Sequence, residues 1–244
     1  LKKARQKLLC ENANFYNYQG MVQDSKLLNE IYSNHKPNII IHLAAQAGVR
    51  YSIENPISYV ESNLIGTFHI LEMARRYKPD HLLMASTSSV YGSNKDMPLH
   101  ENQKCDTPMS FYAATKKSNE VMAYSYSSIY GMKNTALRFF TLYGEFGRPD
   151  MAIFKFTKSI LSGEKIDIYN HGEMKRDFTY IDDLIEGIIS ITTCKPNSLG
   201  LLVLVAMIKA GIARKEALAK PCKIASICIA KAVLFFPALF QRRF

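Results

Sequence analysis

A tyrosine and a lysine four residues apart form the pair of side chains in this sequence that is best suited to acid–base chemistry. Tyr112 and Lys116 lie in the run Tyr-Ala-Ala-Thr-Lys, and a four-residue spacing brings two side chains onto one face of a helix. A lysine ammonium beside a tyrosine favours the phenolate, so we expect the pKa of Tyr112 to fall from about 10 toward neutrality. Such a phenolate can take the proton of an alcohol while a hydride leaves the same carbon.

A run of hydroxyl side chains, Ser86-Thr87-Ser88-Ser89, follows an apolar segment that is typical of a buried strand. Ligands of α/β proteins bind at the carboxyl ends of strands, so this run is expected beside a substrate. A hydroxyl placed there can relay a proton between the tyrosine and a substrate alcohol. A Tyr-x-x-x-Lys spacing alone is common on solvated helices, and the agreement with this hydroxyl run is what favours a functional pair.

Alternating helices and short apolar strands are the elements that must position these residues. The patterns predict helices at residues 24–35, 56–77 and 111–130, and strands at residues 38–42, 80–86 and 135–140. Asp24 is the expected N-cap of the first helix, and Pro56 is tolerated in the first turn of the second. Two successive strand–helix–strand passages predict parallel strands joined by crossover helices. We therefore expect an α/β fold with a doubly wound, parallel, Rossmann-like sheet that is incomplete.

Composition and charge exclude several classes of protein. With 48% hydrophobic and 21% charged residues, the 244-residue chain is neither disordered nor fibrous. Nine basic residues and one acid lie from Thr192 onward, so that segment carries +8 of the net charge of +10. The remainder is nearly neutral, and we expect no nucleic-acid partner. The five cysteines form no Cys-x-x-Cys pair, so no metal site is expected and a cytoplasmic location is favoured.

Residues 192–244 form a basic tail with two apolar runs, at residues 199–208 and 224–240. Charged residues or a proline interrupt both runs before they reach the ~20 apolar residues of a membrane helix. We expect a helical extension here, and a helical hairpin on a membrane is the alternative.

Five blocks of sequence, in order, carry a resemblance to a known family. They read HLAAQAGVRYS at residues 42–52, STSSVYG at 86–92, YAATK at 112–116, LRFFTLYGEFGRPDMA at 137–152 and RDFTYIDD at 176–183. Together they resemble the extended short-chain dehydrogenase/reductases of the NAD-dependent epimerase/dehydratase family, above all the UDP-glucuronate 4-epimerases. The resemblance covers about residues 15–191 and is far more specific than any single block.

The resemblance implies roles for the residues of the catalytic blocks. Tyr112 would be the base that takes the proton of the C4 hydroxyl of the sugar. Lys116 would tune Tyr112 and hold the nicotinamide ribose of NAD. Thr87 would shuttle the proton, and Ser88 and Ser89 would line the sugar site.

The resemblance also implies residues that contact the cofactor and the UDP-sugar. Ala44, Ala45 and Gln46 would pass close to NAD, and Asn63 would support that side of the site. The substrate-binding residues would be Arg50, Thr141, Arg148 and Arg176. Arg148 and Arg176 would face the UDP diphosphate or the sugar carboxylate, which suits a planar cationic fork.

The hydroxyl block favours epimerisation over elimination. The related dehydratases carry Asp-Glu where this chain has Ser88-Ser89, and two serines supply neither an acid nor a base of useful pKa. The resemblance therefore implies inversion at C4 of UDP-glucuronate through a 4-keto intermediate. Two alternatives stay open: a UDP-glucose 4-epimerase or another nucleotide-sugar epimerase, and an inactive remnant or pseudoenzyme of the family.

The chain also departs from the family's pattern. It contains no Gly-x-x-Gly-x-x-Gly turn, in which a helix N-terminus usually receives the pyrophosphate of the cofactor. We expect a chain truncated at its N-terminus, with a C-terminal tail unrelated to the family. The expected division is a partial dinucleotide-binding domain (1–140), part of a substrate-binding region (141–191) and the tail (192–244). The resemblance implies a homodimer formed through a helix bundle that includes residues 111–130.

Overall fold

The computed structural model describes residues 2–173, 176–193, 201–205 and 224–225. Its helices are α1 (Lys2–Cys10), α2 (Ser25–His35), α3 (Tyr51–Glu54), α4 (Ile57–Tyr59), α5 (Gly66–Tyr77), α6 (Phe111–Tyr130), α7 (Ala152–Leu161) and α8 (Ile181–Thr193). A π-helical turn η1 (Val60–Ile65) joins α4 to α5, and two 3₁₀ turns are η2 (Ser88–Tyr91) and η3 (Asn170–Gly172). The strands are β1 (Ile39–His42), β2 (His81–Ala85), β3 (Asn134–Arg138), β4 (Thr141–Tyr143), β5 (Phe178–Tyr180), β6 (Leu201–Val205) and β7 (Ile224–Ala225).

Five parallel strands form the main sheet in the order β6-β3-β2-β1-β7. The register pairs Ile40 with Leu82 between β1 and β2, and Leu82 with Asn134 between β2 and β3. The central strands are nearly continuous apolar runs because both faces of the sheet are covered. The sheet therefore confirms the expected parallel α/β fold.

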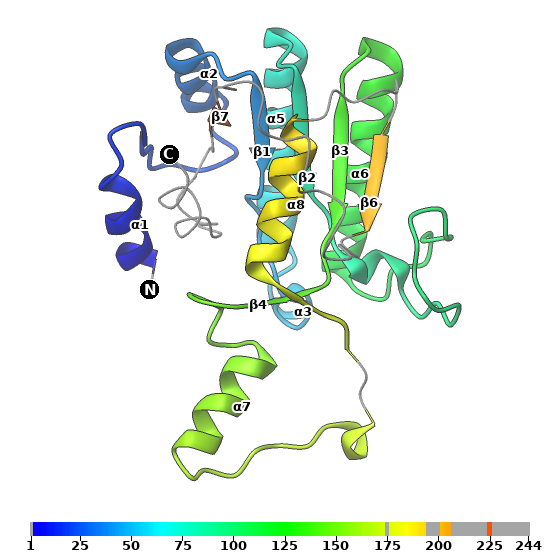
Figure 1. Cartoon of the computed structure of the whole chain (residues 1–244). Coiled ribbons are helices and arrows are strands. Elements are labelled where there is room, and N and C mark those ends of the chain that lie inside the picture. Colours follow the sequence, from blue (N-terminus) through cyan, green and yellow to red (C-terminus); the bar gives the residue numbers. More distant parts are fainter. Residues whose placement is uncertain (1, 174–175, 194–200, 206–223, 226–244) are drawn as a thin grey trace.

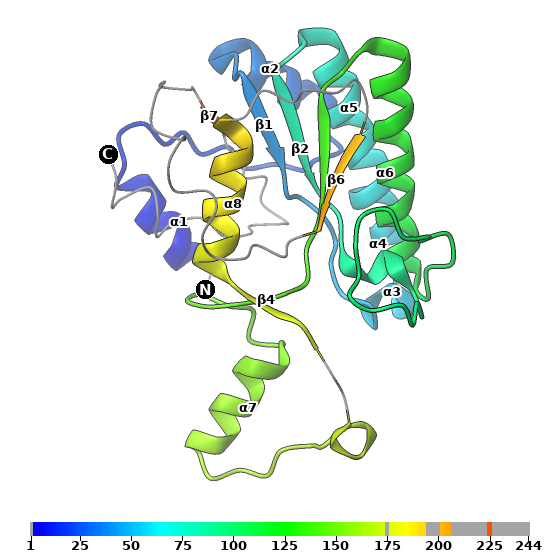
Figure 2. The ribbon, with the colours of Figure 1, turned by 45° about the vertical axis from the view of Figure 1, so that its right-hand side comes forward.

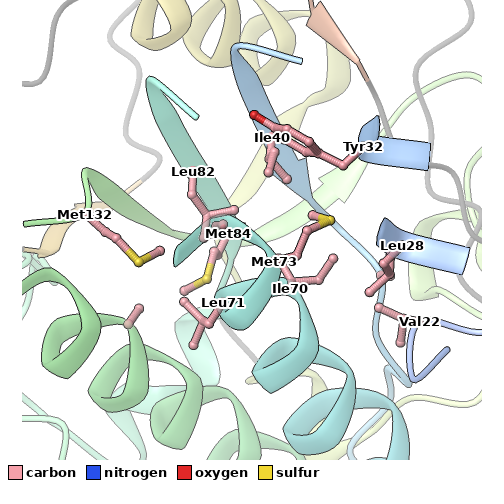
Figure 3. Packing of buried hydrophobic residues seen from close by; sticks show 13 residues of the cluster. Val22, Leu28, Tyr32, Ile40, Ile70, Leu71, Met73, Leu82, Met84 and Met132 are labelled. Carbon is pink, nitrogen blue, oxygen red and sulfur yellow. The ribbon is translucent and has the colours of Figure 1, made fainter. Parts of the chain in front are cut away.

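Helices pack on both faces of this sheet (Figures 1 and 2). Helices α2, α5 and α6 cover one face, and α8 covers the other, where Leu184 and Ile188 pack against Leu83 and Leu137. Figure 3 shows side chains of α2 and α5 meeting those of the strands in the larger core, among them Leu28, Tyr32, Ile40, Ile70, Leu71, Met73, Leu82 and Met84. This double packing fixes where the carboxyl ends of the strands lie.

A smaller segment lies beyond the carboxyl ends of β1, β2 and β3 (Figure 1). It contains α7 and the two-stranded parallel sheet β4-β5, in which Thr141 pairs with Phe178. Residues 141–180 therefore stand next to the edge where an α/β sheet binds its ligands.

The local patterns predicted α2, β1, β2, α6 and β3, whereas α1 and α3 were not predicted and the helix expected at residues 56–77 is divided into α4, η1 and α5. Asp24 caps α2, because its Oδ1 accepts hydrogen bonds from the amides of Lys26 and Leu27, both at 3.0 Å. Pro56 directly precedes α4 with a helical φ of −64°, as expected. Helix α6 spans the residues that the pattern predicted.

The expectation of a helical tail is wrong for residues 201–205. These residues form β6, which pairs with all five residues of β3. The free backbone groups along the edge of β3 provide hydrogen-bonding partners that a local pattern does not reveal. The second apolar run contributes the two residues of β7, and the rest of the tail lies outside the described residues. Among the helices that the structure describes, none has the length and apolar character needed to cross a membrane.

Candidate active site

Helix α6 positions the Tyr112–Lys116 pair at its N-terminal end. Ser110 is the N-cap, and its hydroxyl accepts a hydrogen bond of 3.1 Å from the amide of Ala113. The first turn of the helix is thereby fixed next to the carboxyl end of β2. Tyr112 and Lys116 follow one turn apart, on the face that meets the sheet.

Lys116 is a buried cation held against the end of β2. Lys116 is 3% exposed, and its Nζ donates a hydrogen bond of 2.9 Å to the carbonyl of Ala85. Burial lowers the pKa of Lys116 to about 8. The ammonium has three N–H donors, so it keeps donors for a ligand after bonding to Ala85.

The pKa of Tyr112 differs from the expectation. It is raised above its ordinary value, because burial disfavours the charged phenolate. Hydrogen bonding from the Thr87 side chain and the positive charge of Arg148 act in the opposite direction. The expected lowering by Lys116 is wrong for this structure, since the cation that favours the phenolate is Arg148.

Thr87, the second residue of the hydroxyl run, lies near Tyr112. Thr87 is the N-cap of η2, and its Oγ1 accepts from the amide of Ser89 and donates to the Ser89 hydroxyl, both at 3.2 Å. The amide of Ser88 donates to the carbonyl of Phe139 at 2.9 Å, which ties the run to the end of β3. Thr87, Ser88 and Ser89 therefore share one loop at the carboxyl edge of the sheet.

Asn63 joins the loop after β1 to the catalytic helix. Its side chain is completely buried within the π-helical turn η1. Oδ1 accepts from the amide of Gln46 at 2.8 Å, and Nδ2 donates to the carbonyl of Gln46 at 3.1 Å. Nδ2 also donates to Oγ1 of Thr115 at 3.0 Å, while Thr115 donates to the carbonyl of Tyr112 at 2.8 Å. Ala44, which is buried in the larger core, and Ala45 lead into this loop.

Two ring side chains near the site, His42 and Tyr59, are hydrogen-bonded to other residues of the chain. His42 bonds through Nε2 to Oγ1 of Thr67 at 3.0 Å, and burial, with a smaller contribution from the charge of Lys116, lowers its pKa to about 3. It is a neutral core residue. Tyr59, which the sequence did not single out, donates a 2.5 Å bond to the carbonyl of Gly48, and its ring meets that of Tyr112 edge-on at 6.1 Å.

The four expected substrate-binding residues lie in different surroundings. Arg148 is close enough to Tyr112 and Tyr59 for its charge to lower the pKa of both phenols, and it is paired with Asp150 through Nε at 3.0 Å and through Nη2. Thr141 begins β4, and its amide donates to the carbonyl of Asp177 at 3.3 Å.

The other two arginines are exposed. Arg50 lies over the ring of Tyr169, with Cζ 5.9 Å from the ring centre. Arg176 directly precedes the Asp177 that contacts Thr141, so it stands at the start of β5. The structure thus brings Arg148 to the Tyr112–Thr87 cluster and places Arg50 against the loop near η3.

Sequence reasoning missed one buried group that also meets the hydroxyl run. Glu120 accepts a 2.6 Å hydrogen bond from the hydroxyl of Ser86. Its position, four residues after Lys116, is a signal that could have been read, because the same helix face continues there. No signal in the sequence pointed to Tyr59.

Comparison with known proteins places this arrangement in a family. The model of the NAD dependent epimerase/dehydratase family matches residues 2–198. A probable UDP-glucuronate 4-epimerase of Rhizobium meliloti (strain 1021) is 50% identical over 197 residues, which are 81% of this chain and 58% of that protein. UDP-glucuronate 4-epimerase 4 of Arabidopsis thaliana is 47% identical over 204 residues, 82% of this chain and 46% of its own length.

Solved structures agree with the sequence relatives. The UDP-glucuronic acid 4-epimerase of Bacillus cereus, in complex with UDP-glucuronic acid and NAD, superposes with a TM-score of 0.73 at 33% identity, covering 80% of this chain and 60% of that chain. The UDP-glucose 4-epimerase of Thermotoga maritima, with UDP-glucose, gives a TM-score of 0.72 at 29% identity, with 80% and 63% covered. The chain spans roughly half to three fifths of the length of the curated relatives it matches. With the matched residues extending over most of the sequence and the fold, the chain belongs to the NAD dependent epimerase/dehydratase family.

Proposed function

We propose that this chain carries the catalytic half of a nucleotide-sugar 4-epimerase that acts on UDP-glucuronate with NAD. The observation that carries the proposal is the cluster of Tyr112, Thr87 and Lys116 at the carboxyl edge of the sheet. Two of the relatives described above bear the name of UDP-glucuronate 4-epimerase, and the Bacillus cereus structure holds UDP-glucuronic acid and NAD. In this proposal residues 1–140 supply the cofactor side of the site and residues 141–191 supply the substrate side.

The residues present fit the nicotinamide end of NAD. Lys116 is buried, charged and only partly used by the carbonyl of Ala85, so its remaining donors suit the hydroxyls of a ribose. The loop after β1 is fixed by the hydrogen bonds between Asn63 and Gln46, and its small residues Ala44 and Ala45 suit close approach of a flat ligand to the backbone. Lys116, Tyr112, Asn63 and this loop would hold the cofactor, which when bound supplies a hydride acceptor and donor.

Tyr112 and Thr87 would move the proton of the sugar. In the first half of the reaction the Tyr112 phenolate would take the proton of the C4 hydroxyl through Thr87, and NAD, when bound, would supply the acceptor of the C4 hydride. The 4-keto sugar would then turn over, so that the hydride returns to the opposite face of C4 while Tyr112 gives the proton back to the C4 oxygen. Thr87 and Arg148 counteract the burial that raises the pKa of Tyr112, so these two side chains favour the form of Tyr112 that the reaction needs.

The choice of UDP-glucuronate over UDP-glucose rests on Arg148. Its guanidinium lies near both phenols of the site and suits a carboxylate on the sugar. Asp150 neutralises it in this structure, so a bound carboxylate would have to compete with Asp150. A UDP-glucose 4-epimerase remains the second candidate, because the Thermotoga maritima relative carries that name at similar structural likeness.

The proposal includes a homodimer and a cytoplasmic location. Val121 and Tyr124 of α6 are 57% and 60% exposed, and Phe68 of the neighbouring α5 is 43% exposed, so two adjacent helices present an apolar surface that a second copy could cover. A reducing compartment is favoured because Cys10 and Cys105 are both free thiols.

The proposed function can be tested with the purified chain. We expect conversion of UDP-glucuronate to its C4 epimer in the presence of NAD, resolved by ion-exchange chromatography. Tyr112→Phe should lower the rate at least a hundredfold because it removes the acid–base group. Tyr130→Phe, an exposed tyrosine at the other end of the same helix, is the matched control and should leave the rate unchanged.

The outcomes separate three candidates: a UDP-glucuronate 4-epimerase, a UDP-glucose 4-epimerase and an inactive relative of the family. Turnover of UDP-glucose in preference to UDP-glucuronate would support the second candidate. Binding of NAD without turnover of either sugar would support the inactive relative. Equal rates for the two tyrosine variants would contradict the role of Tyr112.

A further inference from the structure

Three side chains of α6 meet three consecutive residues at the end of β2. Tyr112, Lys116 and Glu120 are spaced four residues apart, so they form a single stripe along the helix. Lys116 bonds to the carbonyl of Ala85, and Glu120 accepts from the hydroxyl of Ser86 at 2.6 Å. The third residue of the stripe, Tyr112, lies near the next residue, Thr87, whose side chain counteracts the rise that burial causes in the pKa of Tyr112. The first two contacts anchor the chain immediately before the residue that would relay the proton.

Glu120 is fixed by more partners than its contact with Ser86. The residue is 2% exposed, and Arg138 donates to Oε1 through Nε and to Oε2 through Nη2, both at 2.9 Å. Lys117 adds a bond of 3.4 Å to Oε2. Arg138 is the last residue of β3, so the carboxylate connects α6 to the ends of two neighbouring strands. Its position is therefore rigid, which makes it a suitable anchor for Ser86.

We propose that Glu120 is a positioning residue that, through Ser86, holds the Thr87 hydroxyl in line between Tyr112 and the sugar. This inference rests on the proposed function for the reaction it serves, while the placement of Thr87 can be tested without turnover. The backbone of this segment is already bonded on one side, through the amides of Ser86 and Ser88 to the carbonyls of Leu137 and Phe139 at 2.8 and 2.9 Å. The Ser86–Glu120 bond fixes the opposite side, toward the helix.

The geometry explains why one hydroxyl bond matters for the rate. A displacement of a catalytic group by about 1 Å can lower a rate on the order of a hundredfold. Loss of the bond to Glu120 frees Ser86 on the helix side, and Thr87 is the next residue along the chain. Other residues bind the nucleotide and the ribose, so loss of the Ser86–Glu120 hydrogen bond should lower kcat and leave KM nearly unchanged.

Ser86→Ala is the decisive variant because it removes the contact without leaving the buried Arg138 unpaired. Ser127→Ala is its matched control. Ser127 is a buried serine of α6, the helix that carries Glu120, and its hydroxyl donates a 2.7 Å hydrogen bond to the carbonyl of Met132, away from the site. We expect Ser86→Ala to lower kcat for epimerisation about tenfold or more, with KM within about twofold of the parent chain. Ser127→Ala should keep the parent's kcat. Glu120→Gln, where it folds, should reproduce the loss in kcat.

Amide hydrogen exchange of residues 86–91 supplies a readout that needs no substrate. We expect these amides to exchange faster in Ser86→Ala than in the parent chain and in Ser127→Ala, with β2 unchanged. Equal exchange in all three proteins would overturn the inference, even if the parent chain turns over no UDP-sugar. Faster exchange with an unchanged kcat in an active chain would also overturn it, as would an equal loss of kcat in the two serine variants.

Discussion

Replacing Asn63 with alanine is expected to lower the free energy of unfolding by about 3 kcal/mol. The side chain makes three hydrogen bonds, two to the backbone of Gln46 and one to Thr115, at 2.8 to 3.1 Å. Each such bond contributes on the order of 1 kcal/mol net. Asn63 is fully buried, so water cannot reach the groups that lose their partner. A loss of about 3 kcal/mol corresponds to roughly a hundredfold change in the unfolding equilibrium.

Urea unfolding followed by far-UV circular dichroism measures this loss, and Asn119→Ala is its matched control. Asn119 is also an asparagine buried in a helix, 5% exposed, but within the described part of the chain its Oδ1 accepts no hydrogen bond. The same atoms are removed in both variants, so the cavity left behind is similar and the difference reports the hydrogen bonds of Asn63. We expect the control to lose about 1 kcal/mol. If the two variants lie within about 1 kcal/mol of each other, Asn63 does not join the loop to the helix as described.

Three further outcomes follow from burial and charge. Leu83→Ala should cost about 2–5 kcal/mol in the same unfolding assay, since Leu83 is fully buried between the sheet and α8; a smaller loss would mean that the core closes around the gap. The pKa of His42 is lowered to about 3, so the stability it contributes is present above pH 6.5 and lost as the pH falls toward 3. His42→Gln should therefore reduce the loss of stability between pH 6.5 and 4.5 by up to about 1.4 kcal/mol per unit, and parallel curves for the two proteins would contradict this. Val121→Lys and Tyr124→Lys should each shift sedimentation from dimer to monomer, and a monomeric parent chain would remove the basis for that expectation.

Most of the elements from α2 to β3 could be predicted because each has a local cause. Asp24 stands at the N-cap that it fills, and β1 and β2 are apolar runs that only a doubly covered sheet accommodates. The strand β6 could not be predicted in this way, since its partner β3 lies more than 60 residues earlier in the chain. A local pattern does not distinguish an apolar helix from an apolar strand when the deciding partner is distant.

Only part of the candidate site could be predicted from the sequence, for a related reason. The spacing of Tyr112 and Lys116 correctly placed both on one face of α6, and the hydroxyl run lies beside them. The direction of the Tyr112 pKa shift could not be read, because it depends on burial by surrounding elements and on Arg148 in a loop after β4. The spacing of Glu120 from Lys116 could have been read, but its partners Ser86 and Arg138 come from distant segments of the chain and could not.

The π-helical turn η1 contains one residue more than an α-helical turn, so it rotates the faces of the helix after it by about 100° relative to those before it. Tyr59, just before the turn, and Asn63, within it, contact the loop after β1; beyond the turn, Ile70 and Leu71 pack against the sheet (Figure 3). Deleting a single residue from η1 would restore one continuous α-helical register, and one of these two groups would then point away from its neighbours. The extra residue lets one helix satisfy two interfaces whose orientations an uninterrupted helix could not match.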